Sequence, residues 1–275
     1  MRSAAELKFR VRQEAANLSF LLRAPRFTGE TPLELALPDP QAVGAALRGS
    51  EYHAFVEATA QSILAHRFPL LGVTIETGPE IRWRRDYRHG KESGTGYFRR
   101  IPYLNFSAVG DHKFIWELNR HQHLVLLGQA YVLTGEKEYT REIQAQIESW
   151  LEQNPFQRGI NWASALEVAF RTLSWIWIYH LAAAAMPPDF RRRFLTALYW
   201  HGHYLAENLS IYFSPNTHLL GEAVALHALA ALFPVFPESE RWRARGAEIV
   251  EAQLEFQVKA DGSHFEQSTY YHVYT

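Results

Sequence analysis

From Gly110 onward the chain is a succession of long helical patterns separated by very short breaks. Loops this short make successive helices antiparallel neighbours. Helical hairpins that repeat every ~40–50 residues predict either a solenoid or a closed α/α toroid, and the pattern alone does not choose between them. The predicted helices cover 112–134, 138–153, 162–186, 188–212, 217–233, 238–259 and a segment from 264 onward. Residues 165–179 are apolar on more than one face, which predicts an inner helix packed between its neighbours.

The region before Gly110 has a different character. Helical spacing of Leu7, Val11, Ala15, Leu18 and Leu22 predicts a helix over 4–22. A loop with four prolines follows, and a second helix is predicted from Glu51 to His66. Beyond it, the short stretches 73–76 and 81–84 have the composition of β-strands. We expect three regions within one structural domain: N-terminal helices and a Pro-rich loop (1–67), an irregular arm rich in arginine and aromatic residues with a β-hairpin or two (68–110), and the helical toroid (111–275).

Composition narrows the function classes. The formal net charge is -1, so the chain lacks the excess of positive charge that indicates binding to nucleic acid or to an anionic membrane. The sequence has no run of about 18 apolar residues, so it predicts no membrane span. Without cysteine, disulfides and thiolate chemistry are excluded. The sequence predicts no cofactor.

The two ends of the chain give two further expectations. The start has no signal peptide, so localisation is open, with the cytoplasm as the default. The chain stops in the middle of a pattern, so we expect a truncated C-terminus.

The stretch from Ser214 to Ala223 concentrates functional groups at one helix start. Ser214-Pro215 breaks the preceding helix, and Asn216 is a natural N-cap. His218 and Glu222 are four residues apart and share a face. The pattern therefore predicts an amide, an imidazole and a carboxylate at a helix N-terminus, where partial positive charge favours an anion.

A second polar helix start covers residues 111–123. Asp111 is a possible cap, and the residues that follow at three- and four-residue spacing favour either a substrate-facing surface or an interhelical hydrogen-bond network. A metal site would have to combine Glu117 with His121, and no third ligand is nearby, so no metal is predicted. The candidates for substrate contact are Lys113, Trp116, Glu117, Asn119 and Arg120.

Two further segments carry candidate residues. In the segment 159–171, Glu167 and Arg171 have the spacing of a helical ion pair, which indicates a buried structural pair as readily as a site. Asn161 and Trp162 at the mouth of that helix are candidates for contact with a sugar ring. The last segment, 261–272, contains Glu266, Tyr271 and His272, for which packing and catalysis are both open.

Taken together, these segments resemble the N-terminal domain of the heparinase II/III-like polysaccharide lyases. The resemblance covers most of the chain, most strongly from about residue 68. It rests on five motifs in order: Asp-x-Lys-x-x-Trp-Glu-x-Asn-Arg at 111–120, Trp150 with Asn154-Pro155, Gly-x-Asn-Trp-x-Ser-x-x-Glu-x-x-x-Arg from 159, Ser-Pro-Asn-Thr-His at 214–218 and Glu-Gln-Ser-x-x-Tyr-His at 266–272.

What the resemblance implies is an incomplete α/α toroid followed by an antiparallel β-sandwich domain, with an anionic polysaccharide between the two. The implied reaction is β-elimination at a uronic acid of a heparan-sulfate-like glycan, alginate or an exopolysaccharide. The family pattern gives Asn216 the role of neutralising the uronate carboxylate and Tyr271 the role of base and acid. His218 and His272 would act as base on one epimer or keep Tyr271 reactive.

Two other classes of protein are open at this stage. One is a glycoside hydrolase on an α/α toroid, in which Glu167, Glu222 or Glu266 would supply a carboxylate pair. The other is a carbohydrate-binding domain without turnover, which would hold glycan through Trp116 and Trp162. The arginines of the arm would hold an anionic chain or form a solvated basic loop: Arg82, Arg84, Arg85, Arg88, Arg99 and Arg100.

Overall fold

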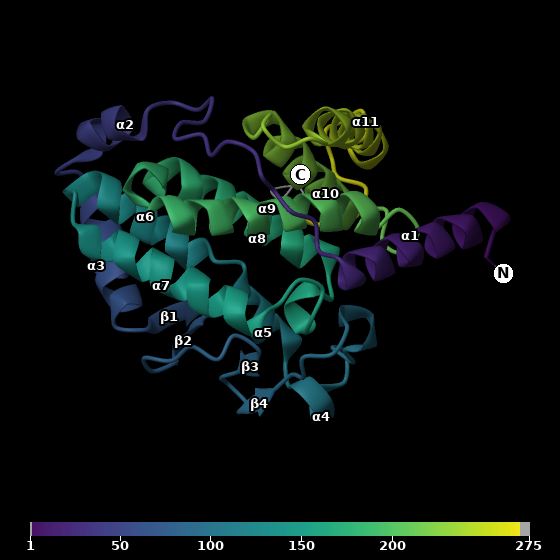
Figure 1. Ribbon diagram of the computed structural model, residues 1–275, viewed down its shortest axis with the longest axis horizontal. Helices are drawn as coiled ribbons and strands as arrows, with labels where there is room; N and C mark the ends of the chain where they lie inside the picture. The colour runs from purple at the N-terminus through teal and green to yellow at the C-terminus, as the bar shows by residue number, and fades with distance from the viewer. Residues whose placement is uncertain (1, 270–275) are drawn as a thin grey trace.

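The computed structural model describes residues 2–269, and these residues are mostly helical. The fold class predicted from the sequence is thus confirmed. The long helices are α1 (Ala4–Leu22), α3 (Glu51–Leu64), α6 (Gln122–Thr134), α7 (Lys137–Gln153), α8 (Ala165–Ala182), α9 (Pro188–Asn208), α10 (Thr217–Leu232) and α11 (Ser239–Gln257) (Figure 1). Shorter helices are α2 (Pro40–Leu47), α4 (Phe106–Val109) and α5 (His112–Asn119), with single 3₁₀ turns η1 (Phe98–Arg100), η2 (Ile160–Trp162) and η3 (Ala183–Ala185).

Three helical hairpins form the body of the fold. Each pairs an inner helix with the one that follows it: α6 with α7, α8 with α9, and α10 with α11. The inner helices also lie side by side, since α8 contacts both α6 and α10, and α3 continues the row beyond α6. This alternation of inner and outer helices is the arrangement expected of an α/α toroid.

Helix α8 is the centre of the hydrophobic core. Trp175, Ile178 and Tyr179 are among its fully buried side chains, and its buried residues occur on more than one face. A helix that is apolar around most of its circumference is stable only when neighbours cover it on several sides. The sequence prediction of an inner helix here is confirmed, since α6, α9 and α10 supply that cover.

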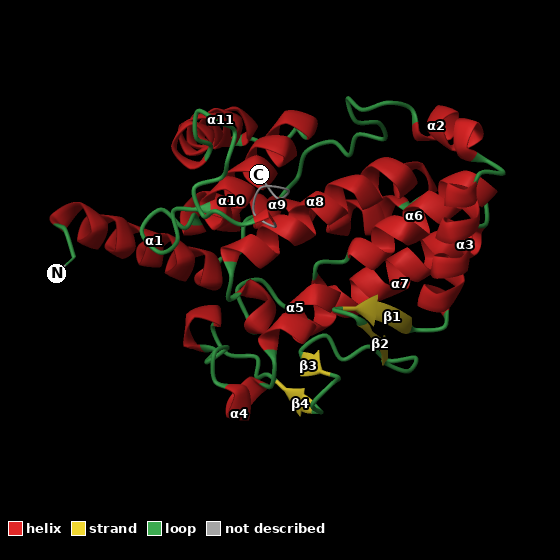
Figure 2. Cartoon of the chain, turned by 180° about the vertical axis from the view of Figure 1, so that it is seen from behind, coloured by secondary structure: helices red, strands yellow, loops and turns green. Residues whose placement is uncertain are grey.

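The arm contains two small antiparallel ribbons. Strand β1 (Arg67–Leu70) pairs with β2 (Val73–Glu76), and β3 (Arg85–Asp86) pairs with β4 (Lys91–Glu92). The ribbons lie along one edge of the molecule, below α5 and α7 (Figure 2). The predicted hairpins are confirmed, although the β-prone stretch 81–84 is turn and coil, with strand beginning only at Arg85.

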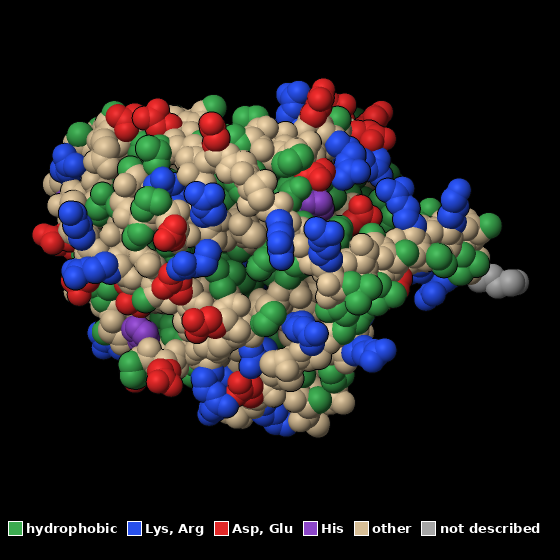
Figure 3. All heavy atoms as spheres, in the orientation of Figure 1, with side chains coloured by type: hydrophobic (Ala, Val, Ile, Leu, Met, Phe, Trp, Pro, Cys, Tyr) green, Lys and Arg blue, Asp and Glu red, His purple; other side chains and the backbone are tan. Residues whose placement is uncertain are grey.

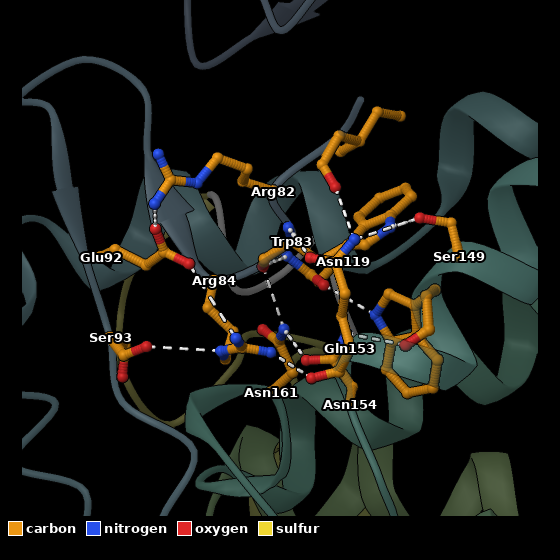
Figure 4. A network of polar contacts seen from close by, with 12 residues as sticks. Arg82, Trp83, Arg84, Glu92, Ser93, Asn119, Ser149, Gln153, Asn154 and Asn161 are labelled. Carbon is orange, nitrogen blue, oxygen red and sulfur yellow. Dashed lines mark hydrogen bonds and ion pairs between the residues drawn. The ribbon is translucent and has the colours of Figure 1, made fainter. Parts of the chain in front are cut away.

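A buried polar network joins this arm to the helices (Figure 4). The Trp83 carbonyl accepts from Asn119 Nδ2 at 2.8 Å and from Asn161 Nδ2 at 3.1 Å. Asn161 Nδ2 also donates to Asn154 Oδ1 at 2.8 Å, and Trp150 Nε1 donates to Asn119 Oδ1 at 2.7 Å. Because buried polar groups are costly when unpaired, these bonds hold the arm against α5, α7 and η2.

Three predicted boundaries were wrong. The predicted helix over 112–134 is two helices, because His121 adopts a left-handed conformation (φ 59°) between α5 and α6. The Pro-rich loop contains the unpredicted helix α2, which starts at Pro40 behind an Asp39 cap. The helix predicted from 264 does not start there, because His264 forms a β-bridge with Val258, residues 265–266 form a turn, and helical backbone starts only at 269.

Helix α1 projects from the body (Figure 1), and several of its apolar side chains are exposed. Leu22 is 89% exposed and Val11 71%, whereas the buried residues of this helix are Gln13 and Asn17. Gln13 Nε2 donates to the Glu207 carbonyl, so polar contacts anchor α1 to the end of α9. Across residues 2–269, no helix combines the length and apolarity that crossing a membrane requires.

Candidate active site

A cleft of about 460 Å³ lies where α1, the arm, the start of α8 and the start of α10 meet. It brings together residues that are more than 200 positions apart in the chain. Four of the residues singled out from the sequence line it: Arg99, Trp116, His218 and Glu222. The remaining walls come from Phe9, Arg10, Gln13, Phe98, Tyr103, Leu104, residues 163–165, Tyr204, residues 208–210, Tyr212 and Phe213.

Asn216 begins α10 as its N-cap, as the sequence predicted. Its Oδ1 accepts at 3.1 Å from the His218 backbone N–H, from the Ser214 hydroxyl and from His218 Nδ1. The backbone N–H can only donate, so it fixes the oxygen of the amide toward the helix. The two N–H groups of Nδ2 make no hydrogen bond with the described residues, and they are the donors that Asn216 can offer to a ligand.

The same contact sets the tautomer of His218. Since Asn216 Oδ1 is an acceptor, Nδ1 of the imidazole carries the proton and Nε2 keeps its lone pair. Partial burial lowers the pKa of His218, opposed by the charges of Glu167 and Glu266. The lowered pKa favours the neutral ring, whose Nε2 can accept a proton.

Glu222 is fully buried at the base of the cleft, one helical turn beyond His218. Its carboxyl group contacts the backbone N–H and the hydroxyl of Ser210, both at 2.7 Å. Burial raises the pKa of Glu222 to about 8, and the two contacts with Ser210 oppose that rise. Glu222 thus anchors the loop between α9 and α10, while its side chain is also part of the cleft lining.

The predicted ion pair between Glu167 and Arg171 was wrong. Glu167 instead makes a two-pronged contact with Arg120, at 2.7 Å to Nε and 3.0 Å to Nη2. Arg120 also donates to Glu117 Oε2 at 2.9 Å. These three residues form a charged cluster beside His218. The negative charge of Glu167 acts to raise the pKa of His218, against the larger lowering by burial.

Arg171 is fully buried and has no carboxylate partner among residues 2–269. Its Nε donates to His201 Nε2 at 2.9 Å and its Nη2 to the Asn161 carbonyl at 3.1 Å. The guanidinium also lies over the rings of Trp150 and Trp162, 4.6 Å and 5.2 Å from their centroids. Burial lowers the pKa of Arg171 to about 9. Cation–π contact and hydrogen bonds replace the missing counter-ion.

Three candidates for substrate contact lie inside the protein, and a fourth borders the cleft. Asn119, Asn161 and Trp162 are fully or almost fully buried, and their polar groups are used internally. Trp116 borders the cleft, but its Nε1 donates to the Ile160 carbonyl at 3.0 Å. The placement corrects the expectation of direct contact for the three buried residues, which hold η2 and the arm in position.

The other candidates differ in accessibility. Lys113 is exposed at the start of α5, where Asp111 is the predicted cap. Glu266 is partly buried near His218, and its Oε1 makes no hydrogen bond within the described chain. Tyr271 and His272 lie outside the described residues.

Sequence reasoning missed the contribution of α1 to the cleft. Arg10 comes from that helix, and Tyr103 comes from the loop after η1. Arg99, one of the arm arginines, pairs with Glu14 of α1 at 2.7 Å and donates to Asn208 Oδ1 at 3.2 Å. No local pattern signals such a contact, because it joins segments nearly 90 residues apart.

Beside the cleft, Asn216 offers its amide donors, and the lining of the cleft contributes the His218 imidazole and the cationic side chains of Arg10 and Arg99. Among residues 2–269, no group of three His, Asp or Glu side chains has the arrangement of a metal site. The cleft can bind an anion and remove a weakly acidic proton beside it.

The fold and the cleft define a domain of helical hairpins with a polar site at one end of its inner helices. The family model described as "Heparinase II/III N-terminus" matches residues 48–275, which is most of the chain. The chain therefore belongs to this family.

Similar proteins and structures agree with this assignment. A heparin-sulfate lyase of Pedobacter heparinus is 31% identical over 189 residues, covering 66% of this chain and 28% of the relative. One of Bacteroides stercoris is 28% identical over 187 residues, covering 60% of this chain and 28% of that protein. The chain thus spans little more than a quarter of these curated relatives.

Solved structures show the same fold. The heparan sulfate lyase HepC of Pedobacter heparinus superposes with a TM-score of 0.61 at 24% identity, over 96% of this chain and 37% of that one. A heparinase III structure gives a TM-score of 0.64 at 20% identity, over 95% and 37%. At these identities the likeness establishes the helical toroid architecture and nothing finer.

Proposed function

We propose that this chain is the helical part of a polysaccharide lyase that cleaves a uronic-acid-containing glycan by β-elimination. The observation that carries the proposal is the pairing of Asn216 with His218, whose imidazole lines the cleft. One amide oxygen both caps α10 and fixes the imidazole, which leaves amide N–H donors and an accepting ring nitrogen together. Family membership and the lyase names of the relatives support the reaction class.

The first requirement of the reaction is to stabilise negative charge. The C5 hydrogen of a uronate is only weakly acidic, because the adjacent carboxylate is already negative and disfavours the further negative charge that loss of the proton creates. When that proton leaves, an enolate-like charge develops on the carboxyl group. Donors directed at those oxygens stabilise it. In our proposal Asn216 Nδ2 supplies them, and the arginines on the facing wall, Arg10 and Arg99, attract the anionic chain.

The second requirement is a base and an acid. A base removes the C5 proton, the electron pair forms the C4–C5 double bond, the C4–O bond breaks, and an acid protonates the departing oxygen. We propose Tyr271 for the base and acid, with His218 and His272 either lowering its pKa or acting as base on one epimer. A free tyrosine with a pKa of about 10 is a weak base at pH 7, so such neighbours are needed.

The substrate class and the partner domain are part of the same proposal. The relatives named heparin-sulfate lyases favour a sulfated glycosaminoglycan, while alginate and exopolysaccharides present the same uronate chemistry. We further propose that a C-terminal β-sandwich domain of the whole protein closes the cleft from the other side.

The placement of the carboxylates argues against a glycoside hydrolase. Such enzymes need one carboxyl group as acid and a second as base or nucleophile across the scissile bond. Glu167 is bonded to Arg120, and Glu222 is fully buried against Ser210. Of the candidates, only Glu266 has a carboxylate oxygen without a hydrogen-bond partner among the described residues.

A direct test is the near-ultraviolet absorbance of heparan sulfate, alginate and other uronate glycans mixed with the whole protein. Elimination creates an unsaturated sugar that absorbs, so absorbance should rise with the true substrate. A Tyr271→Phe variant should abolish the rise. New reducing ends without absorbance would contradict the proposal in favour of hydrolysis, and binding without either signal would indicate a binding domain.

A further inference from the structure

A second hollow of about 540 Å³ lies on the outer surface, between the end of α7, the first half of α9 and the end of α1. Its size is typical of small-ligand sites, about 300–1,000 Å³. Figure 3 shows a hollow with apolar side chains in the middle of this face and Lys and Arg side chains around it. We call it the α7–α9 groove; its lining is Phe20, Leu21, Ala24, Leu151, Pro155, Phe156, Arg158, Arg192, Arg193, Thr196 and Trp200.

Two aromatic rings form a rigid platform in the groove. Phe156 and Trp200 are stacked, with centroids 5.5 Å apart and an interplanar angle of 16°. Trp200 Nε1 donates to the Pro25 carbonyl at 2.7 Å, so its indole cannot rotate freely. Trp200 is only partly buried, which leaves part of its ring accessible from the groove. A fixed, partly exposed aromatic surface suits the apolar face of a sugar ring.

The charged residues of the groove are all arginines. Arg158, on the loop after α7, and Arg192, on α9, are exposed and make no ion pair with any described residue. Arg193 is paired with Glu148 of α7. The lining therefore has two uncompensated positive charges next to an aromatic surface. Guanidinium groups bind carboxylate and sulfate oxygens through paired hydrogen bonds.

The groove is separate from the cleft. The α1 residues in the cleft include Gln13, whereas those in the groove begin at Phe20. Between them, Asn17 is fully buried, accepting from Gln157 Nε2 at 2.7 Å and from Asn208 Nδ2 at 2.9 Å. This contact closes the passage beneath α1. From Trp200 to Asn208, α9 advances by about 12 Å.

We propose that the α7–α9 groove is an accessory binding site for a carboxylated or sulfated saccharide, distinct from the cleft. The aromatic platform selects a sugar ring and the free arginines select its negative charge. The ligand class rests on the proposed function, since a uronate polysaccharide is long enough to occupy both places. The groove would hold one part of the polymer while another part enters the cleft.

The test is isothermal titration of a sulfated, uronate-containing tetrasaccharide into the whole protein carrying Tyr271→Phe, so that cleavage does not consume the ligand. We expect two binding sites. Adding Arg158→Ala with Arg192→Ala should weaken the groove site at least tenfold, on the order expected for losing charge-assisted hydrogen bonds. Arg158→Lys with Arg192→Lys keeps the charge and should weaken it less.

The matched control is Arg141→Ala with Arg243→Ala, which removes two exposed arginines from other parts of the surface. If the control and the groove variant lose the same amount of binding affinity, the loss comes from the change in net charge, and the proposal is overturned. Unchanged binding in the groove variant, or equally tight binding of a neutral tetrasaccharide, would also overturn it. Because binding is measured apart from cleavage, absence of lyase activity would leave this result interpretable.

Discussion

At the scale of single residues, Asn216 carries the most structural and chemical demands. Its Oδ1 caps α10 and orients His218, while its Nδ2 makes no hydrogen bond with the described residues. Asn216→Ala should lower kcat/KM by about 10²–10³-fold, as expected when one oxyanion donor is removed. Ser214→Ala is the control, since it removes only one hydrogen bond to the same Oδ1. If the two variants lose activity equally, Asn216 acts only as a helix cap.

Glu222 gives a prediction about stability and pH. Its pKa is raised from 4.5 to about 8 by burial, so the folded state favours the protonated form. Its contribution to the free energy of unfolding is complete below pH 4.5 and is lost as pH rises through about 8. The glutamine of the Glu222→Gln variant cannot ionise, so the unfolding free energy of this variant lacks this dependence on pH.

Chemical denaturation between pH 5 and pH 9 measures the difference. The advantage of the wild type over Glu222→Gln in unfolding free energy should shrink steadily with rising pH. A constant advantage across this range would show that the pKa of Glu222 is not raised in the folded state. An advantage that grows with pH would show that Ser210 stabilises the ionised form more than burial disfavours it.

At the scale of secondary-structure elements, Arg171 ties η2 to α8 and α9. Arg171→Ala would leave His201 Nε2 and the Asn161 carbonyl without their donor and would open a cavity between Trp150 and Trp162. We expect a loss of about 3–5 kcal/mol in unfolding free energy, measured by urea denaturation. Arg141→Ala, on the exposed surface of α7, should change it by less than about 0.5 kcal/mol. A small loss for Arg171→Ala would contradict the bonding described.

The same elements show what the sequence could and could not predict. The inner position of α8 and the Asn216 cap follow from local patterns, and both were predicted correctly. The break at His121 was not, because a left-handed residue other than glycine gives no pattern. Asn119 and Asn161 look like surface donors at helix ends, yet their shared partner, the Trp83 carbonyl, lies 36 and 78 positions away. Long-range partners of this kind decide between a substrate contact and a buried network.

At the scale of the whole molecule, the hairpins place two sites along α9 on either side of the α1 contact. We propose that proton abstraction takes place at the cleft, and that the α7–α9 groove, with its aromatic platform and exposed arginines, binds another part of the same polymer. The part of the arm that lines the cleft is tied to the loop after α7, because the Phe98 N–H donates to the Gln157 carbonyl at 3.1 Å and the Gly159 N–H donates to the Gly96 carbonyl at 2.8 Å.

The mass of the products from a defined uronate oligosaccharide tests the central claim most directly. β-Elimination adds no water, so we predict that the masses of the two fragments sum to the mass of the substrate. Hydrolysis would make that sum heavier by one water molecule. Fragments with the mass of one added water, formed by the whole protein and lost in Asn216→Ala, would contradict a lyase.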